Sequence, residues 1–125
     1  YDYADRIASR GFVFMDSPGY DPVSVTGKVA GGCNLVLFTT GRGSVLGFKP
    51  TPSIKICSNS MTYERLIDDM DFDAGKVLQE GANMDTVATE LLDLVTAVAS
   101  GQATRSEKQN VGEVEFTPWN PWGVI

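Results

Sequence analysis

Three short apolar runs, each followed by a polar or glycine-rich stretch, organise the hydrophobic pattern of this chain. They occupy residues 12–15, 35–38 and 53–57. A continuous apolar run of this length is typical of a strand that is buried on both faces, as in a parallel sheet. In the third run, Ile54 and Ile56 alternate with Lys55. This alternation predicts a strand nearer to an edge of the sheet.

A long amphipathic helix is predicted over residues 84–99, where apolar side chains recur at steps of three and four. Asn83 is suited to cap the start of this helix, and Gly101 is suited to end it. We expect the face that carries Leu91, Leu92 and Val95 to pack on the sheet.

Shorter helices are predicted before, between and after the strands. One begins with Asp21 as its N-cap and Pro22 at the first helical position, and ends at the glycine pair 31–32. Ser60 is suited to cap a second helix, and a helical turn is expected near Val77. Residues 1–10 are expected to form a lead-in helix or a linker.

The order of these elements predicts the fold class. Strands separated by helices favour a parallel sheet with crossover connections. We therefore expect one three-layer, Rossmann-like α/β domain over residues 1–125, with a mostly parallel sheet. Residues 102–125 are expected to be an irregular C-terminal tail, with a short edge strand at Val114 and Phe116. Its two tryptophans, Trp119 and Trp122, are expected to pack on the domain or on a neighbour.

The composition excludes several classes of protein. The chain has 42% hydrophobic and 21% charged residues, as globular domains do. No apolar run approaches the ~20 residues of a membrane span, and no secretory signal is present, so no membrane partner is expected. A net charge of −6 with scattered basic residues argues against a nucleic-acid partner. A small anion can still bind where a single Arg is well placed.

Histidine is absent from the chain, which removes the commonest general base and the commonest metal ligand. Cys33 and Cys57 lack CxxC spacing, so they favour a reducing cytoplasm over a disulfide framework. Both are expected to be small buried hydrophobes. The acidic residues at 68–73 lack the spacing of an EF-hand and favour a solvated face over a metal site.

The sharpest chemical signal is a glycine-rich loop after the second predicted strand. In an open parallel sheet, the loops at the carboxyl ends of the strands line the ligand crevice. The hydroxyls, the flanking glycines and the guanidinium of this loop suit an oxyanion such as a carboxylate. A solvated or salt-bridged Arg in a simple turn is an equally good interpretation. The candidate substrate-binding residues of this loop are Thr39, Thr40, Gly41, Arg42, Gly43 and Ser44.

Four further residues on the same expected rim are candidates for the site. Asp16, after the first predicted strand, is a candidate catalytic acid or base, or a metal ligand. Tyr20 is suited to donate a hydrogen bond to a substrate, or to cover its loop. Lys49 is a second candidate anion contact, although a lone loop Lys is more often solvated. Asn59 is suited to bind the ligand or to turn the chain.

Several ordered motifs recur along the chain, at 17–19, 38–43, Gly47, Lys55, Asn59, 71–72, 74–75 and 98–101. In their order and spacing they resemble the C-terminal part of the altronate and galactarate dehydratase family, which also includes sulfolactate sulfo-lyase large subunits. The resemblance runs from about Gly11 to the C-terminus. There are two departures. Asp73 replaces a frequent Asn, and Ser44-Val45 stand where family members have Thr-Pro, a change that we expect to reshape the loop and hence the choice of substrate.

The resemblance implies a cytoplasmic hydro-lyase of carbohydrate-acid catabolism that dehydrates galactarate, altronate or a similar acid to a 2-keto-3-deoxy acid. A sulfo-lyase acting on sulfolactate stays open. It implies Fe²⁺ in the full-length enzyme, with ligands mostly outside this chain, and the other domains of the parent enzyme as partners, with a possible homo-oligomer. The chain begins at Tyr1 rather than Met, which suggests a fragment. We expect this fragment to bind the substrate and to be inactive alone. A structural or docking domain is the alternative.

Overall fold

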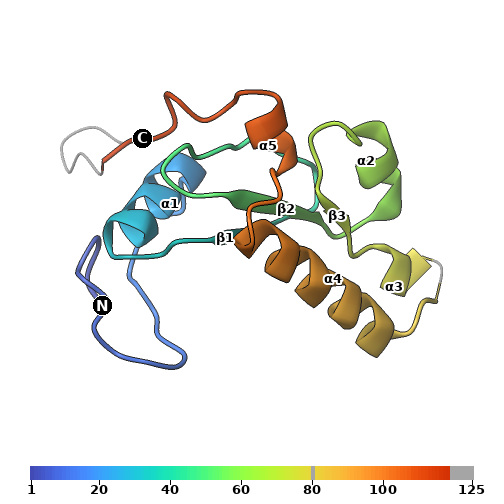
Figure 1. Cartoon of the computed structure of the whole chain (residues 1–125), viewed down its shortest axis with the longest axis horizontal. Coiled ribbons are helices and arrows are strands. Elements are labelled where there is room, and N and C mark those ends of the chain that lie inside the picture. The colour runs from blue at the N-terminus through green and yellow to red at the C-terminus, as the bar shows by residue number, and fades with distance from the viewer. Residues whose placement is uncertain (80, 119–125) are drawn as a thin grey trace.

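The computed structural model describes residues 1–79 and 81–118, and Trp119 and Trp122 lie outside the described residues. A small parallel sheet lies at the centre, with helices on both of its sides (Figure 1). Within the described residues, every helix is too short or too polar to span a lipid bilayer. The elements are α1 (Asp21–Ala30), β1 (Val36–Thr40), β2 (Ser53–Cys57), α2 (Ser60–Arg65), β3 (Phe72–Asp73), α3 (Lys76–Gln79), α4 (Met84–Ala99) and α5 (Arg105–Lys108).

The three strands form one parallel sheet in the order β1-β2-β3. This arrangement confirms the α/β class and the strands predicted near 35–38 and at 53–57. β2 lies in the middle, however, so its predicted place near an edge is wrong. All five residues of β2 are buried, including Lys55. The alternation of Ile54, Lys55 and Ile56 therefore reflects two different buried faces rather than one buried and one solvated face.

Each face of the sheet carries its own core. Ile54 and Ile56 face α4 in a cluster with Phe72, Val87 and Val98. Val36 and Phe38 are in register with Ser53 and Lys55, and therefore lie on the opposite face. There they pack with Val25 of α1 and with Leu46 and Phe48. Helices thus cover both faces, as the predicted layered arrangement requires.

The connection between β1 and β2 is a loop rather than a helix. Parallel strands need a crossover that returns the chain to the starting edge, and a helix usually provides it. Here residues 41–52 make the return, and they bury Leu46 and Phe48 against Val25 on the way. Leu46 and Phe48 therefore take the place of the apolar face of a crossover helix.

The helix predicted at 84–99 is confirmed to the residue as α4. The side chain of Asn83 accepts hydrogen bonds from the amides of Asp85 and Thr86, and Gly101 has a positive φ of 106°. Leu91 and Val95 pack on the core, but Leu92 is 63% exposed, so its predicted contact with the sheet is wrong. The apolar stripe of α4 is therefore narrower than the sequence pattern indicates.

The strand predicted at 12–15 is wrong. Phe12 is 99% exposed and Phe14 is 72% exposed, and only Met15 of this run is buried. Among the described residues, no strand pairs with this segment. An apolar run becomes a strand only where another strand receives its hydrogen bonds, and 12–15 lies outside the sheet.

Several smaller predictions also fail. Residues 1–10 contain a turn at Tyr3 and Ala4 and no helix, so the lead-in helix is wrong and the linker stays a prediction. Val114 and Phe116 are not in a strand. Tyr20, not Asp21, occupies the N-cap position of α1, and it makes no capping hydrogen bond with its side chain. Asn59, not Ser60, caps α2 through the amide of Thr62 at 2.8 Å. The helical turn expected near Val77 is confirmed as α3.

Candidate functional site

The carboxyl edge of the sheet gathers the segments that follow all three strands. The Asn59 Nδ2 donates a hydrogen bond to the carbonyl of Gly41 at 2.6 Å. The amide of Ser58 donates to the carbonyl of Thr40 at 2.9 Å, and the amide of Ala74 donates to the carbonyl of Cys57 at 2.8 Å. The loop after β1 is thereby held to the segment after β2, and that segment to the one after β3.

The loop after β1 is held in its conformation by a hydrogen bond within the loop and by the packing of Gly43 on Leu66. The Gly43 amide donates to Thr40 Oγ1 at 3.1 Å, which closes a tight turn around Arg42. Gly43 has a positive φ of 92°, and a Cβ there would overlap the Leu66 side chain. Glycine at this position therefore satisfies both the backbone conformation and the close approach of α2.

Arg42 stands on this fixed turn with its charge uncommitted. The residue is exposed, and among the described residues its guanidinium takes part in no ion pair and no hydrogen bond. A guanidinium offers a planar fork of donors that matches a carboxylate in two places. The structure excludes a salt-bridged Arg42 within the described residues, so a solvated Arg42 and an anion-binding Arg42 stay as the two interpretations of this loop.

Asn59 links the loop to the rest of the edge. Its Oδ1 accepts from the Thr62 amide at 2.8 Å while its Nδ2 donates to Gly41, so both ends of the side-chain amide are occupied. A Cβ at Gly75 would overlap the main chain of Asn59. Asn59 therefore positions the loop of Arg42, and these bonds use only one of the two N–H groups of its side-chain amide.

The other candidates lie in different places. Lys49 precedes the amino end of β2, where its ammonium donates to Glu113 at 2.6 Å and to Asn110 at 2.9 Å. Asp16 is exposed and follows no strand; its amide donates to the carbonyl of Tyr1 at 2.9 Å. Tyr20 is exposed at the start of α1. The structure thus brings residues 39–44 together with Asn59 and does not bring Lys49 to them.

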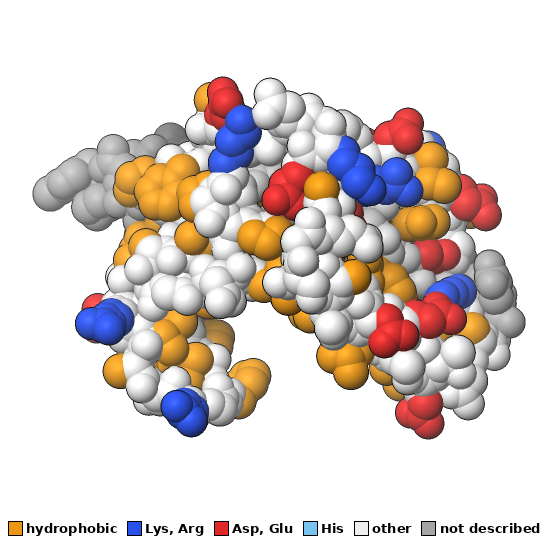
Figure 2. Space-filling model, in the orientation of Figure 1, with side chains coloured by type: hydrophobic (Ala, Val, Ile, Leu, Met, Phe, Trp, Pro, Cys, Tyr) orange, Lys and Arg blue, Asp and Glu red, His pale blue; other side chains and the backbone are white. Residues whose placement is uncertain are grey.

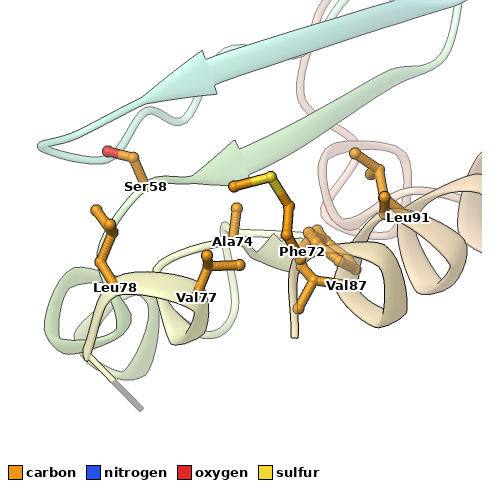
Figure 3. A pocket seen from close by; sticks show the side chains of 9 residues that line it. Ser58, Phe72, Ala74, Val77, Leu78, Val87 and Leu91 are labelled. Atoms are coloured by element: carbon orange, nitrogen blue, oxygen red, sulfur yellow. The ribbon is translucent and has the colours of Figure 1, made fainter. Parts of the chain in front are cut away.

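An apolar groove beside this edge was not predicted. It has a volume of about 380 Å³ and lies between the end of β2, α3 and α4. Figure 3 shows Ser58 at one end, Leu78 and Val77 from α3, and Val87 and Leu91 from α4. Leu78 and Met84 line it and are exposed. The signal in the sequence is the occurrence of these two large apolar residues within an acidic, glycine-punctuated stretch.

Basic side chains are scattered on the face shown in Figure 2, among acidic ones, and form no continuous basic surface. Among the described residues, no three side chains of His, Cys, Asp or Glu are grouped to hold a metal ion. The side chains of the described residues therefore do not form a metal site by themselves.

Comparison with known proteins finds the same family that the sequence motifs resemble. A profile of the family described as D-galactarate/Altronate dehydratase, C-terminal, matches residues 1–124. The altronate dehydratase of Bacillus subtilis (strain 168) is 34% identical over 113 residues, which cover 90% of this chain and 22% of that protein. The galactarate dehydratase (L-threo-forming) of Escherichia coli (strain K12) is 33% identical over 97 residues, which cover 78% of this chain and 18% of that protein.

A sulfo-lyase is similar to a comparable degree. The (2R)-sulfolactate sulfo-lyase subunit beta of Chromohalobacter salexigens is 32% identical over 115 residues, which cover 92% of this chain and 29% of that protein. The chain thus spans between about a fifth and a third of the length of these relatives. Since the family profile covers nearly every residue, the resemblance inferred from the motifs is confirmed, and the chain belongs to the D-galactarate/altronate dehydratase family as its C-terminal domain.

Proposed function

We propose that this chain is the substrate-binding C-terminal domain of a cytoplasmic hydro-lyase that dehydrates a sugar acid, such as galactarate or altronate, to a 2-keto-3-deoxy acid. The observation that carries the proposal is the unpaired guanidinium of Arg42 on a rigid turn at the carboxyl edge of a parallel sheet. Ligands of open α/β sheets bind at this edge. Membership of the dehydratase family supplies the class of reaction.

The chemistry explains why an unpaired Arg is useful here. Dehydration next to a carboxylate needs a base for the α-proton, an acid for the departing hydroxyl and a group that holds the carboxylate. When the α-proton leaves, negative charge spreads onto the carboxylate, and a bidentate guanidinium stabilises it. Arg42 supplies this holding group. Fe²⁺ would be bound mostly by residues of the parent enzyme outside this chain.

The test uses Arg42→Ala and Arg42→Lys in the full-length parent protein, assayed with Fe²⁺ against galactarate, altronate and sulfolactate. We expect kcat/KM on the preferred substrate to fall by roughly 10²–10³-fold, the scale of one donor to a developing oxyanion. Lys should not restore it, since an ammonium keeps the charge but loses the fork. The melting temperature should stay at the wild-type value because Arg42 has no partner within the described residues.

The same substrate panel decides the reaction class. Turnover of galactarate or altronate supports the hydro-lyase, whereas turnover of sulfolactate alone supports the sulfo-lyase alternative that the Chromohalobacter salexigens relative raises. Lys108→Met is a matched control, since it removes an exposed cation of α5 far along the chain from the loop. Wild-type turnover by both Arg42 variants would leave Arg42 as a surface charge and end the proposal.

A second candidate function is a docking domain that orders the catalytic part of the parent enzyme or joins copies of it in a homo-oligomer. The apolar groove between α3 and α4 favours it, because Leu78 and Met84 leave apolar surface in water. If this candidate is right, Leu78→Asp in the parent should lower the melting temperature and activity together. Leu92→Asp, at an exposed position of α4 outside the groove, should change neither.

A further inference from the structure

A cluster of one lysine and two serines lies where α1 meets the segment before it. The Lys28 ammonium donates to Ser24 Oγ at 2.5 Å and to Ser17 Oγ at 3.0 Å. A longer contact of 3.4 Å joins it to the Ser24 carbonyl, and the two hydroxyls are 3.0 Å apart. All three side chains are half-buried. The cluster is therefore a built feature of the fold rather than three freely rotating side chains.

The hydrogen bonds of this cluster leave donors available. The Lys28 ammonium lies 3.0 Å or less from the two hydroxyls, whereas its third contact, to the Ser24 carbonyl, is longer at 3.4 Å. One hydroxyl proton lies between Ser17 and Ser24. The remaining hydroxyl proton has no acceptor within the cluster. Since Lys28 also forms no ion pair within the described residues, the cluster presents a positive charge and a spare donor.

A pocket of about 190 Å³ opens beside this cluster, between α1 and β1. Asp21, Ser24 and Lys28 line it from one face of α1, at the i, i+3 and i+7 positions. Thr39, at the carboxyl end of β1, lines it from the other side. The pocket therefore has donors and a cation around Lys28, and the exposed carboxylate of Asp21, an acceptor, about two turns of α1 away toward the start of the helix.

This arrangement matches the chemistry of a short hydroxy acid. A carboxylate fits the cation and spare donor at Lys28 and Ser24. A hydroxyl group on the same molecule fits the acceptor Asp21, which would repel a second anion but accepts a hydrogen bond. An inorganic anion would satisfy only the first half of the pocket. A molecule with a carboxylate at one end and hydroxyls along its chain satisfies both.

We propose that the pocket between α1 and β1 is a second binding site for a hydroxy-carboxylate, held by Lys28 and Ser24 at its carboxylate and by Asp21 at a hydroxyl. The proposal deepens the proposed function, since it rests on a sugar acid as the ligand class. It is separate from the Arg42 loop, whose residues other than Thr39 do not line this pocket. Lys28 is a binding residue here and takes no part in a chemical step.

The first test is protection of lysines in the parent protein. Lysine acetylation is followed site by site by mass spectrometry, with and without altronate, which has one carboxylate, and with inorganic sulfate as a comparison anion. We expect altronate to slow acetylation of Lys28 by about tenfold, as occupancy of about nine-tenths of the sites would. Lys108 should react at an unchanged rate, and sulfate should protect Lys28 less than altronate does. Equal rates at Lys28 with and without altronate would overturn the site.

The second test is Lys28→Met in the parent, with Lys108→Met as its control. We expect the dissociation constant for altronate to rise about tenfold or more, the scale of a lost charged hydrogen bond. Ser24→Ala should raise it less. Unchanged binding in a folded Lys28→Met would refute the site, and the protection assay on the unmodified protein decides the matter if this variant fails to fold.

The outcomes separate the two proposals. Protection of Lys28 in a parent protein that turns over no sugar acid would retain the site and remove the proposed function. Normal turnover with an unprotected Lys28 would retain the proposed function and remove the site.

Discussion

Lys55 and Arg42 carry the same charge in two regions of this small domain, and the fold treats them in opposite ways. Lys55 lies in the central strand β2 with 1% of its surface exposed, 3.9 Å from the Asp71 carboxylate. Arg42 lies at the carboxyl edge in solvent, with no ion pair among the described residues. The comparison teaches that the charge of Lys55 is committed to holding the sheet together, whereas that of Arg42 is left for a ligand.

Asp71 makes the buried region possible. Its Oδ2 accepts from the Lys55 amide at 2.8 Å, and its Oδ1 accepts from the Arg105 amide at 2.7 Å. One carboxylate therefore ties the central strand to the start of α5. Burial lowers the pKa of the Lys55 ammonium, and the carboxylates of Asp71 and Asp69 oppose that shift.

The largest expected effect comes from breaking the buried region at Asp71. Asp71→Ala removes both amide acceptors and leaves the Lys55 ammonium buried without its partner. We expect the free energy of unfolding to fall by about 3–5 kcal/mol, the range for removing one member of a buried pair. Urea unfolding of the chain measures it. A loss no larger than that of an exposed substitution such as Leu92→Ala would show that the two regions do not differ as argued.

A smaller effect should appear in the pH dependence at Lys55. Its folded pKa is lowered from 10.5, so the unfolded chain binds more protons in the window between the lowered value and 10.5. Stability is then gained as pH rises through this window and lost as pH falls through the folded pKa. We expect this alkaline gain in wild type and its loss in Lys55→Met, compared by thermal melts at matched pH values. Parallel pH profiles for the two proteins would contradict a perturbed Lys55.

Lys49 tests the comparison with an exposed ion pair, for which we expect the smallest effect on stability. It has an ion-pair partner, Glu113, as Lys55 does, but both side chains are substantially exposed. The hydrogen bond from Lys49, together with its charge, lowers the pKa of Glu113. Because water screens exposed pairs, Lys49→Met should leave the melting temperature within experimental error at physiological salt. A large fall in melting temperature would mean that having an ion-pair partner, rather than being buried, is what makes the charge of a residue such as Lys55 important for stability.

The sequence predicts those elements whose signals are local. α4 has an unbroken periodicity and a capping residue at its start, and its bounds were predicted to the residue. The position of β2 was also predicted, because its apolar residues stand next to turn-forming residues in the sequence. α5 carries a capping box between Thr104 and Glu107 that could have revealed it, since a threonine followed three residues later by glutamate marks a helix start.

The remaining features depend on partners distant in sequence. The central position of β2 depends on Asp71 neutralising Lys55 and on β3, which has only two residues and no pattern to recognise. The run at 12–15 has the composition of a strand but no strand beside it among the described residues. The edge that gathers Arg42 and Asn59 was predicted from topology. Their roles toward a ligand stay predictions.

The loop that connects β1 to β2 has one half in solvent and one half in the core, and this division matters for protein engineering. Residues 41–45 form the turn around Arg42 and its exposed continuation, whereas Leu46 and Phe48 fill the core beneath α1. A combinatorial library aimed at new acid specificity should therefore randomise Ser44 and Val45, where side chains reach solvent or the turn itself. It should keep Leu46 to Phe48 constant, because most changes there would disturb the core. Such variants would be lost through misfolding before their specificity could be measured.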